Sequence, residues 1–292
     1  MIIELTSQYL FPLLFLTGFA AGTVDAIAGG GGLITVPALL GLGIPPHIAL
    51  GTNKLQSLFG TAVATYRYHK QGWLQREGLV LGLVLSFIGA VLGSISSQFI
   101  QSDILKKVIP LLLLFVLLYT IFTPKLGMNA EKPKMKEVPF YFIFGTLLGF
   151  YDGFLGPGTG SFWVFALIYF LGHSLLKATA YTKIFNLNTN IAAMICFAIG
   201  NNIDYKIGFC MAAGQILGGH LGAHLAIKKG LQIIRPIFIT VVSLTIATLI
   251  YKNYIQTGTW KIIYRDPFKI LIGILFLLSI LGLSYFLHRK NK

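Results

Sequence analysis

The sequence predicts an all-α polytopic membrane protein, made of two inverted repeats that each contain a glycine-broken helix, with roughly 8–11 membrane segments. Two observations lead to this prediction. The chain of 292 residues is 55% hydrophobic and only 11% charged, whereas soluble domains carry about 25% charged residues. Its apolar stretches of 18 or more residues are long enough to span a bilayer as helices.

The second observation is an internal repeat. Gly22-x-x-Asp25-x-x-x-Gly29-x-Gly31 returns 127 residues later as Gly149-x-x-Asp152-x-x-x-Gly156-x-Gly158. Each copy follows an apolar stretch and precedes a short apolar segment of about a dozen residues, which is shorter than a full span. Each half is therefore expected to contain one helix that is broken by glycines and carries one acid.

The apolar runs divide the chain into four parts: a first repeat at 1–123, a basic linker at 124–138, a second repeat at 139–251, and a C-terminal loop with a final span at 252–292. The expected segments of the first repeat are 9–28, 32–43, 48–66, 79–100 and 104–122. Those that follow are 139–155, 159–171, 178–199, 207–227, 234–251 and 268–287.

Basic residues in the loops predict the orientation. If every segment crosses, fourteen Lys and Arg residues lie on one side and seven on the other. The positive-inside rule then places the N-terminus outside and the C-terminus inside the cell membrane, which we take to be a bacterial inner membrane. Five crossings per half invert the second repeat, unless the short segments are re-entrant. The net charge of +14 is explained by these loops, so no nucleic-acid partner is expected.

Four ionisable residues fall inside predicted spans, in two sets at matching places: Asp25 with Lys54, and Asp152 with Lys183. A charge at the bilayer centre costs about 2.5–3.5 kcal/mol on insertion scales, so their repetition indicates a function. The acids are expected to be coupling or structural groups, and the lysines to bind an anion. The alternative is that Asp25 pairs with Lys54 only to hold two helices together.

The glycine runs are expected to begin two half-helices whose first turns expose unpaired N–H groups. Such N-termini favour anions, and glycine lets an anion approach the backbone closely. If the two half-helices enter from opposite sides, their positive ends converge near the midplane. The alternative is that the glycines form only sharp turns. The candidate substrate-binding residues are Gly30, Gly31, Gly32, Asn53, Lys54, Gly158, Thr159, Gly160, Lys183 and Asn186.

Other chemistry has little support. His220 and His224 have the i, i+4 spacing of some metal ligands, but no carboxylate or cysteine accompanies them, so no metal site is expected. Cys196 and Cys210 form no disulfide framework. No nucleophile with a neighbouring base and no phosphate-binding loop is visible. We therefore expect neither an enzyme nor a cofactor.

The glycine run and its surroundings resemble the TauE/SafE family of sulfite exporters, which are membrane permeases. The matching residues are Gly22-x-x-Asp25-x-x-x-Gly29-Gly30-Gly31-Gly32, Val36-Pro37-x-Leu39, Gly43, Asn53-Lys54 and Gln71-Gly72. The second copy departs from the pattern at Pro157 and Thr159, and has Thr182 in place of Asn before Lys183. The resemblance implies transport of sulfur-containing anions.

The sequence thus predicts a secondary transporter for small anions, namely sulfur-containing oxyanions or organosulfonates, that works by alternating access. The alternative is a passive anion channel with the same site. The expected partners are a small anionic substrate and the lipid bilayer, and the sequence leaves open whether the protein forms a homo-oligomer.

Overall fold

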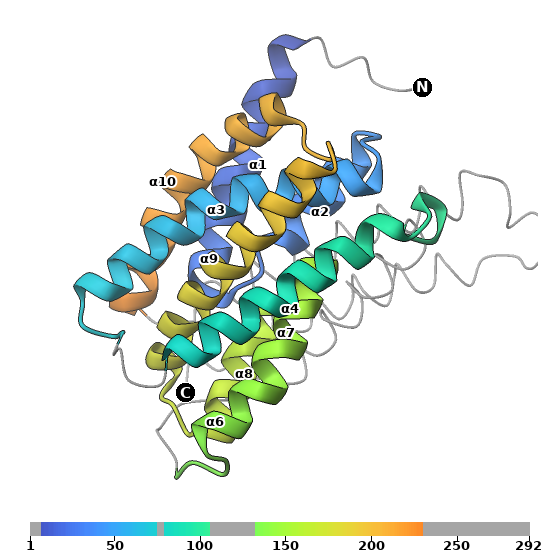
Figure 1. The fold of residues 1–292 in the computed structure, drawn as a ribbon. Helices are drawn as coiled ribbons and strands as arrows, with labels where there is room; N and C mark the ends of the chain where they lie inside the picture. The colour runs from blue at the N-terminus through green and yellow to red at the C-terminus, as the bar shows by residue number, and fades with distance from the viewer. Residues whose placement is uncertain (1–6, 75–78, 106–131, 230–292) are drawn as a thin grey trace, which may run out of the picture.

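The computed structural model describes residues 7–74, 79–105 and 132–229. Within these ranges every regular element is a helix (Figure 1). The helices are α1 (Ser7–Ala28), α2 (Gly32–Gly41), α3 (Pro46–Lys70), α4 (Leu79–Phe99), α6 (Glu137–Phe140), the π-helix η1 (Tyr141–Gly145), α7 (Thr146–Phe154), α8 (Thr159–Leu171), α9 (Leu175–Ile199) and α10 (Tyr205–Lys229). The predicted spans 234–251 and 268–287, and nearly all of 104–122, lie outside the described residues.

The predicted segments correspond closely to these helices. The two short segments are separate helices, α2 and α8, and each follows the glycine break that the repeat predicted. The expected span 139–155 consists of α6, η1 and α7, which follow one another without a gap.

The two halves of the chain interleave. α1 packs along α10, and α7, which occupies the corresponding place in the second half, packs along α4. α3 and α9 contact each other between these two pairs, as Figure 1 shows. α3 also contacts α10, and α9 contacts α4. Each broken helix therefore packs against a long helix of the opposite half.

Glycines allow the close approach within both outer pairs. A Cβ added to Gly218 of α10 would lie 2.1 Å from the carbonyl oxygen of Phe19 in α1. A Cβ added to Gly153 of α7 would lie 2.0 Å from the carbonyl oxygen of Ala90 in α4. Small residues let helices in lipid pack backbone to backbone. The glycine-bearing faces of α10 and α7 are thus helix–helix contact surfaces.

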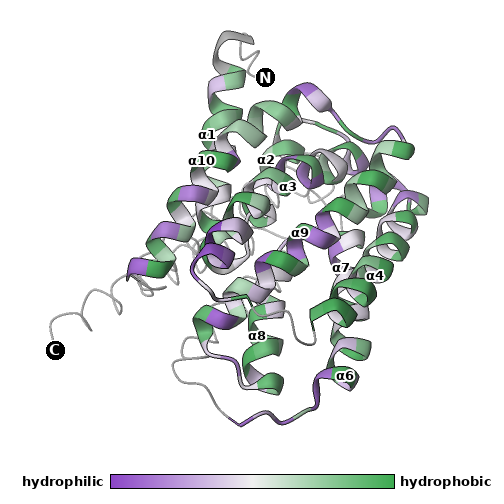
Figure 2. Ribbon diagram, turned by 60° about the vertical axis from the view of Figure 1, so that its left-hand side comes forward, coloured by the Kyte–Doolittle hydropathy of each residue, from purple (hydrophilic) through white to green (hydrophobic). Residues whose placement is uncertain are grey.

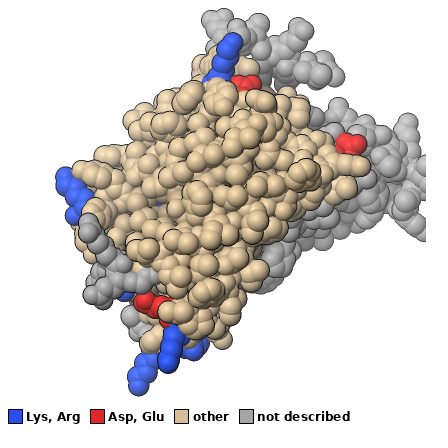
Figure 3. All heavy atoms as spheres, viewed as in Figure 1, with Lys and Arg blue, Asp and Glu red and all other residues tan. Residues whose placement is uncertain are grey.

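α4 places small residues inward and large apolar residues outward. Gly82, Ser86 and Gly93 are buried, whereas one exposed stripe consists of Val80, Val84, Ile88, Leu92, Ile95 and Phe99. Figure 2 shows the hydrophobic character of this helix. In Figure 3 a broad face of the molecule carries few charges, and the lysines and arginines lie at its upper, left and lower edges. An apolar stripe around a small-residue core fits a helix that faces lipid.

Two of the described helices are both long and apolar enough to cross a membrane, at Leu10–Ile27 and Leu79–Phe99. The central helices α3 and α9 are 25 residues long but carry more polar residues. These polar residues are mostly buried: α3 contributes Thr52, Asn53, Lys54, Gln56 and Ser57, and α9 contributes Thr179, Thr182, Lys183, Asn186, Thr189 and Asn190. The centre of the molecule is therefore polar, and the candidate site lies there.

Candidate functional site

The two glycine breaks meet backbone to backbone. Gly29 has a φ of +73°, and a Cβ added to it would lie 2.4 Å from the Cα of Gly160. A Cβ on Gly32, the first residue of α2, would lie 3.1 Å from the Cα of Pro157. Residues with side chains could not approach so closely. The N-terminal ends of α2 and α8, one from each half, are consequently brought to the same place.

Each buried lysine pairs with the acid of the opposite half. Lys54 Nζ on α3 lies 2.7 Å from Asp152 Oδ1 on α7, and Lys183 Nζ on α9 lies 3.2 Å from Asp25 Oδ2 on α1. Lys183 also donates to the backbone carbonyl of Asp25. The alternative reading of the sequence, in which Asp25 pairs with Lys54, is wrong. It fails because α3 and α9 pack against each other, and from there each lysine reaches the acid of the opposite half.

The two ion pairs differ in their hydrogen bonds. Asp152 accepts from Lys54, from Thr159 Oγ1 at 3.2 Å and from Thr189 Oγ1. Asp25 accepts from Lys183 and from the backbone N–H of Gly31 at 3.2 Å. Hydrogen bonds to a carboxylate stabilise its charged form. The carboxylate of Asp152 is therefore held by one ammonium and two hydroxyls, and that of Asp25 by one ammonium and one amide.

All four charged residues are enclosed. Lys183 is 0% and Lys54 is 1% exposed, while Asp152 is 4% and Asp25 is 8% exposed. Each ammonium neutralises one carboxylate, so the four side chains together carry no net charge. Burial of a charge is tolerated when it is paired and hydrogen-bonded. The structure thus has an enclosed site in which each lysine is ion-paired with a carboxylate.

A polar shell surrounds the pairs. Asn53 Oδ1 accepts hydrogen bonds from Thr35 Oγ1 and from Gln56 Nε2. Three further polar atoms of this shell are buried without a hydrogen-bond partner among the residues that the structure describes: Gln56 Oε1, Thr182 Oγ1 and Asn186 Oδ1. Buried polar atoms are paired in most native structures, and exceptions often mark places for water or a ligand. These atoms lie within three residues of Lys54 or Lys183 along α3 and α9.

The structure places six of the ten sequence-predicted substrate-binding residues at the two breaks. Gly30 and Gly31 form the turn before α2, and Gly32 begins that helix. Gly158 caps α8 with a φ of +83°, and Thr159 and Gly160 are its first residues.

Sequence reasoning missed Thr189 and Thr35, which contact Asp152 and Asn53. Thr189 lies one helical turn beyond residues 185 and 186, so its position on the polar face of α9 could have signalled it. Thr35 lies inside the apolar segment after the glycine run, and only the packing of α2 on α3 identifies it.

The two histidines at i, i+4 spacing, His220 and His224, both lie on α10. His220 contacts Arg67, and no cluster of three or more His, Cys, Asp or Glu residues with metal-binding geometry occurs among the described residues. The ion-paired site is built from lysine, carboxylate, hydroxyl and amide groups instead.

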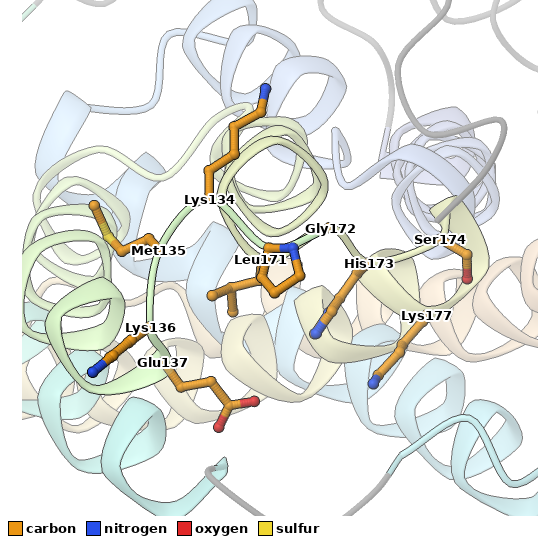
Figure 4. Close-up of a pocket in the computed structure, with 10 residues that line it drawn as sticks. Lys134, Met135, Lys136, Glu137, Leu171, Gly172, His173, Ser174 and Lys177 are labelled. Carbon is orange, nitrogen blue, oxygen red and sulfur yellow. The ribbon is translucent and has the colours of Figure 1, made fainter. Parts of the chain in front are cut away.

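A cavity of about 660 Å³ lies away from the ion pairs, between the residues before α6 and the turn that joins α8 to α9. Figure 4 shows His173 and Lys177 side by side at this turn, with Lys134 pointing away from them. The ammonium of Lys134 lies 3.7 Å from the centroid of the Tyr169 ring. Burial, with a smaller contribution from Lys177, lowers the pKa of His173 to about 4. None of the four paired residues lines this cavity.

Comparison with known proteins agrees with this architecture, which is that of a helical membrane protein with buried charges at broken helices. The family described as Sulfite exporter TauE/SafE matches residues 14–249. The chain is 43% identical over 244 residues to a probable membrane transporter protein of Haemophilus influenzae, covering 84% of this chain and 96% of that protein. It is 37% identical over 252 residues to the probable membrane transporter protein YfcA of Escherichia coli, covering 86% and 94%.

A third relative is the probable membrane transporter protein ORF9 of a Sinorhizobium species, which is 40% identical over 239 residues and covers 82% of this chain and 91% of its own length. No solved structure matches the chain. The chain belongs to the sulfite exporter TauE/SafE family. It is accordingly a membrane protein of a transporter family, with a small-molecule substrate.

Proposed function

We propose that this protein is a secondary transporter for small anions, namely sulfur-containing oxyanions or organosulfonates, and that it works by alternating access. One observation carries the proposal: two buried lysines, one from each half, lie where two glycine breaks and two helix N-termini meet. Ammonium groups and helix N-termini are the groups that bind anionic oxygens. The family name supports sulfite or a related anion as the substrate.

The two carboxylates provide a mechanism for coupling. In the enclosed site Asp152 and Asp25 are ion-paired with the two lysines to which an anion would bind. A proton that neutralises one carboxylate weakens its hold on the lysine, and an anion then takes its place. One monoanion and one proton would cross together as an electroneutral pair. Asp25 and Asp152 are therefore the proposed coupling acids.

The unequal hydrogen bonding indicates which pair opens more readily. Asp25 lacks the two hydroxyl donors that hold Asp152, and its side chain is 12% exposed, compared with 5% for Asp152. We assign the Lys183–Asp25 pair as the first to open. If the halves are inverted repeats, as the odd number of expected crossings per half predicts, the two pairs serve opposite sides of the membrane. Opening one pair at a time would then give alternating access.

The proposed orientation follows from the basic loops: the N-terminus outside and the C-terminus inside a bacterial inner membrane. Lys134 and Lys177, which line the 660 Å³ cavity, then lie at the cytoplasmic end. The substrate-binding groups remain those chosen from the sequence, centred on Lys54 and Lys183, with Thr35 and Thr189 as supporting hydroxyls.

Flux into proteoliposomes tests the proposal. Purified protein is reconstituted, and uptake of 35S-labelled sulfite, thiosulfate, sulfate, taurine and sulfoacetate is followed with and without an imposed pH gradient. We expect at least one of these anions to accumulate above its external concentration when the gradient is present. Uptake that only equilibrates indicates the alternative, a passive anion channel. Uptake no faster than in protein-free vesicles for every anion would refute both.

A further inference from the structure

Gln215 of α10 is buried at the junction of three helices. It is 1% exposed, and its carboxamide fills the space that two glycines leave. A Cβ on Gly22 of α1 would lie 2.9 Å from Gln215 Oε1, and one on Gly60 of α3 would lie 2.1 Å from the same atom. Gly22 is about one helical turn from Asp25 along α1. The amide therefore lies beside the charged site, although it belongs to neither ion pair.

The carboxamide of Gln215 is unpaired on both sides. Neither Oε1 nor Nε2 has a hydrogen-bond partner in the described structure. A primary amide offers two donor hydrogens and two acceptor lone pairs, and leaving them unmet inside a protein is unfavourable. Gln56 Oε1, one turn before Gly60 on α3, is unpaired as well. The unpaired amide on α10 thus contacts the stretch of α3 that carries Gln56, whose Oε1 lacks a partner among the described residues although its Nε2 donates to Asn53.

A second glutamine, Gln98, makes the hydrogen bonds that a structural role requires and that Gln215 lacks among the described residues. Gln98 of α4 donates from Nε2 to the carbonyl oxygens of Ser94 at 3.1 Å and Cys196 at 3.3 Å. Its Oε1 accepts from Asn202 Nδ2 at 2.9 Å. Gln98 therefore links α4 to both ends of the turn after α9. Gln215 makes no such link, so helix packing does not explain why an amide occupies this position.

We propose that Gln215 is a substrate-binding residue of the transport pathway, where its Nε2 donates a hydrogen bond to an oxygen of the anion as that anion approaches the lysines. This inference rests on the proposed transport function. An oxyanion carries several acceptor oxygens, so one can contact a lysine while another contacts the amide. A neutral donor holds the anion less strongly than an ammonium does, which suits a group on the way into the site.

The test compares Gln215→Leu with Gln98→Leu in the full-length protein. Thermal unfolding is measured in detergent, and the KM for 35S-sulfite and 35S-taurine uptake is measured in proteoliposomes. For Gln215→Leu we expect a Tm equal to or above that of the wild type, because a similarly sized apolar group removes two unmet polar atoms. We also expect the KM to rise about tenfold, the effect of losing one hydrogen bond to a charged group. Gln98→Leu should lower the Tm and leave the KM unchanged.

A second variant, Gln215→Glu, keeps the shape and adds a carboxylate, so at pH 8 it should reduce anion uptake more than Gln215→Leu does. The inference is overturned if Gln215→Leu lowers the Tm as much as Gln98→Leu, which would make the amide structural. It is also overturned if the wild type transports either anion and Gln215→Leu has an unchanged KM. If the wild type moves neither anion, the KM comparison is made with whichever of the five anions it transports, and transport of none removes the proposed function and this inference together.

Discussion

The crossed ion pairs can be tested by a double-mutant cycle. Lys54→Met leaves the carboxylate of Asp152 buried, with only hydroxyl partners. Breaking one side of a buried ion pair costs about 3–5 kcal/mol. At about 2–4 °C per kcal/mol this lowers the Tm by about 10 °C. The second change, Asp152→Asn, removes the unpaired charge and keeps one oxygen that can accept a hydrogen bond from Thr159 or Thr189.

We therefore expect Lys54→Met/Asp152→Asn to recover most of the Tm that Lys54→Met loses, with a coupling energy of about 2 kcal/mol or more. The matched control is Lys54→Met/Asp25→Asn, which leaves Asp152 and Lys183 both unpaired. This control should be at least as unstable as the sum of its single variants.

The assay is thermal unfolding of the purified full-length protein in detergent, with size-exclusion chromatography to confirm that each variant is monodisperse. Recovery by Asp25→Asn instead of Asp152→Asn would show that the lysine and acid of the same half are paired, and would refute the crossed arrangement. No recovery in either double variant would show that the four charges do not form the pairs described.

Three further predictions concern the breaks, the loop histidine and the orientation. Gly29→Ala should abolish folding or uptake because the new Cβ would lie 2.4 Å from the backbone of Gly160. Gly43 also has a positive φ but nothing lies within 4 Å of an added Cβ, so Gly43→Ala should cost only about 1–2 kcal/mol of stability. Equal losses of membrane yield and flux in the two variants would contradict this prediction. Because the pKa of His173 is about 4 when folded and about 6.5 when unfolded, the unfolded state binds more protons between these values, so the Tm should fall as the pH falls from 6.5 to 4. His173→Asn should flatten this dependence of Tm on pH. If the dependence is unchanged in the variant, His173 is not its cause. In a cysteine-free background an impermeant thiol reagent added outside intact cells should label Asn202→Cys and not Lys134→Cys; the reverse pattern would invert the proposed topology.

The sequence alone indicated most of the architecture because membrane helices follow from local composition. A lipid-facing segment must be apolar over its own length, so the runs that became α1, α4, α8 and α10 could be read without knowing their neighbours. The repeated glycines and acids also identified where each broken helix ends, since a helix interrupted by Gly29 or Gly156 needs a backbone conformation that glycine adopts readily. The lysines stood out because a charge inside a span is rare.

Only the tertiary structure decided which charges meet. Asp25 and Lys54 are nearer in sequence than Lys183 and Asp25, and separation along the chain gave no reason to prefer the more distant partner. The choice depends on how the two halves pack at the centre, where α3 lies against α9 and each lysine meets the acid of the other half. The unpaired state of the Gln215 amide could not be predicted either, because the sequence does not show the neighbours or the hydrogen bonds of a glutamine. Helix identity is set by residues close in sequence, whereas ion pairing inside a membrane protein is set by which helices share a face.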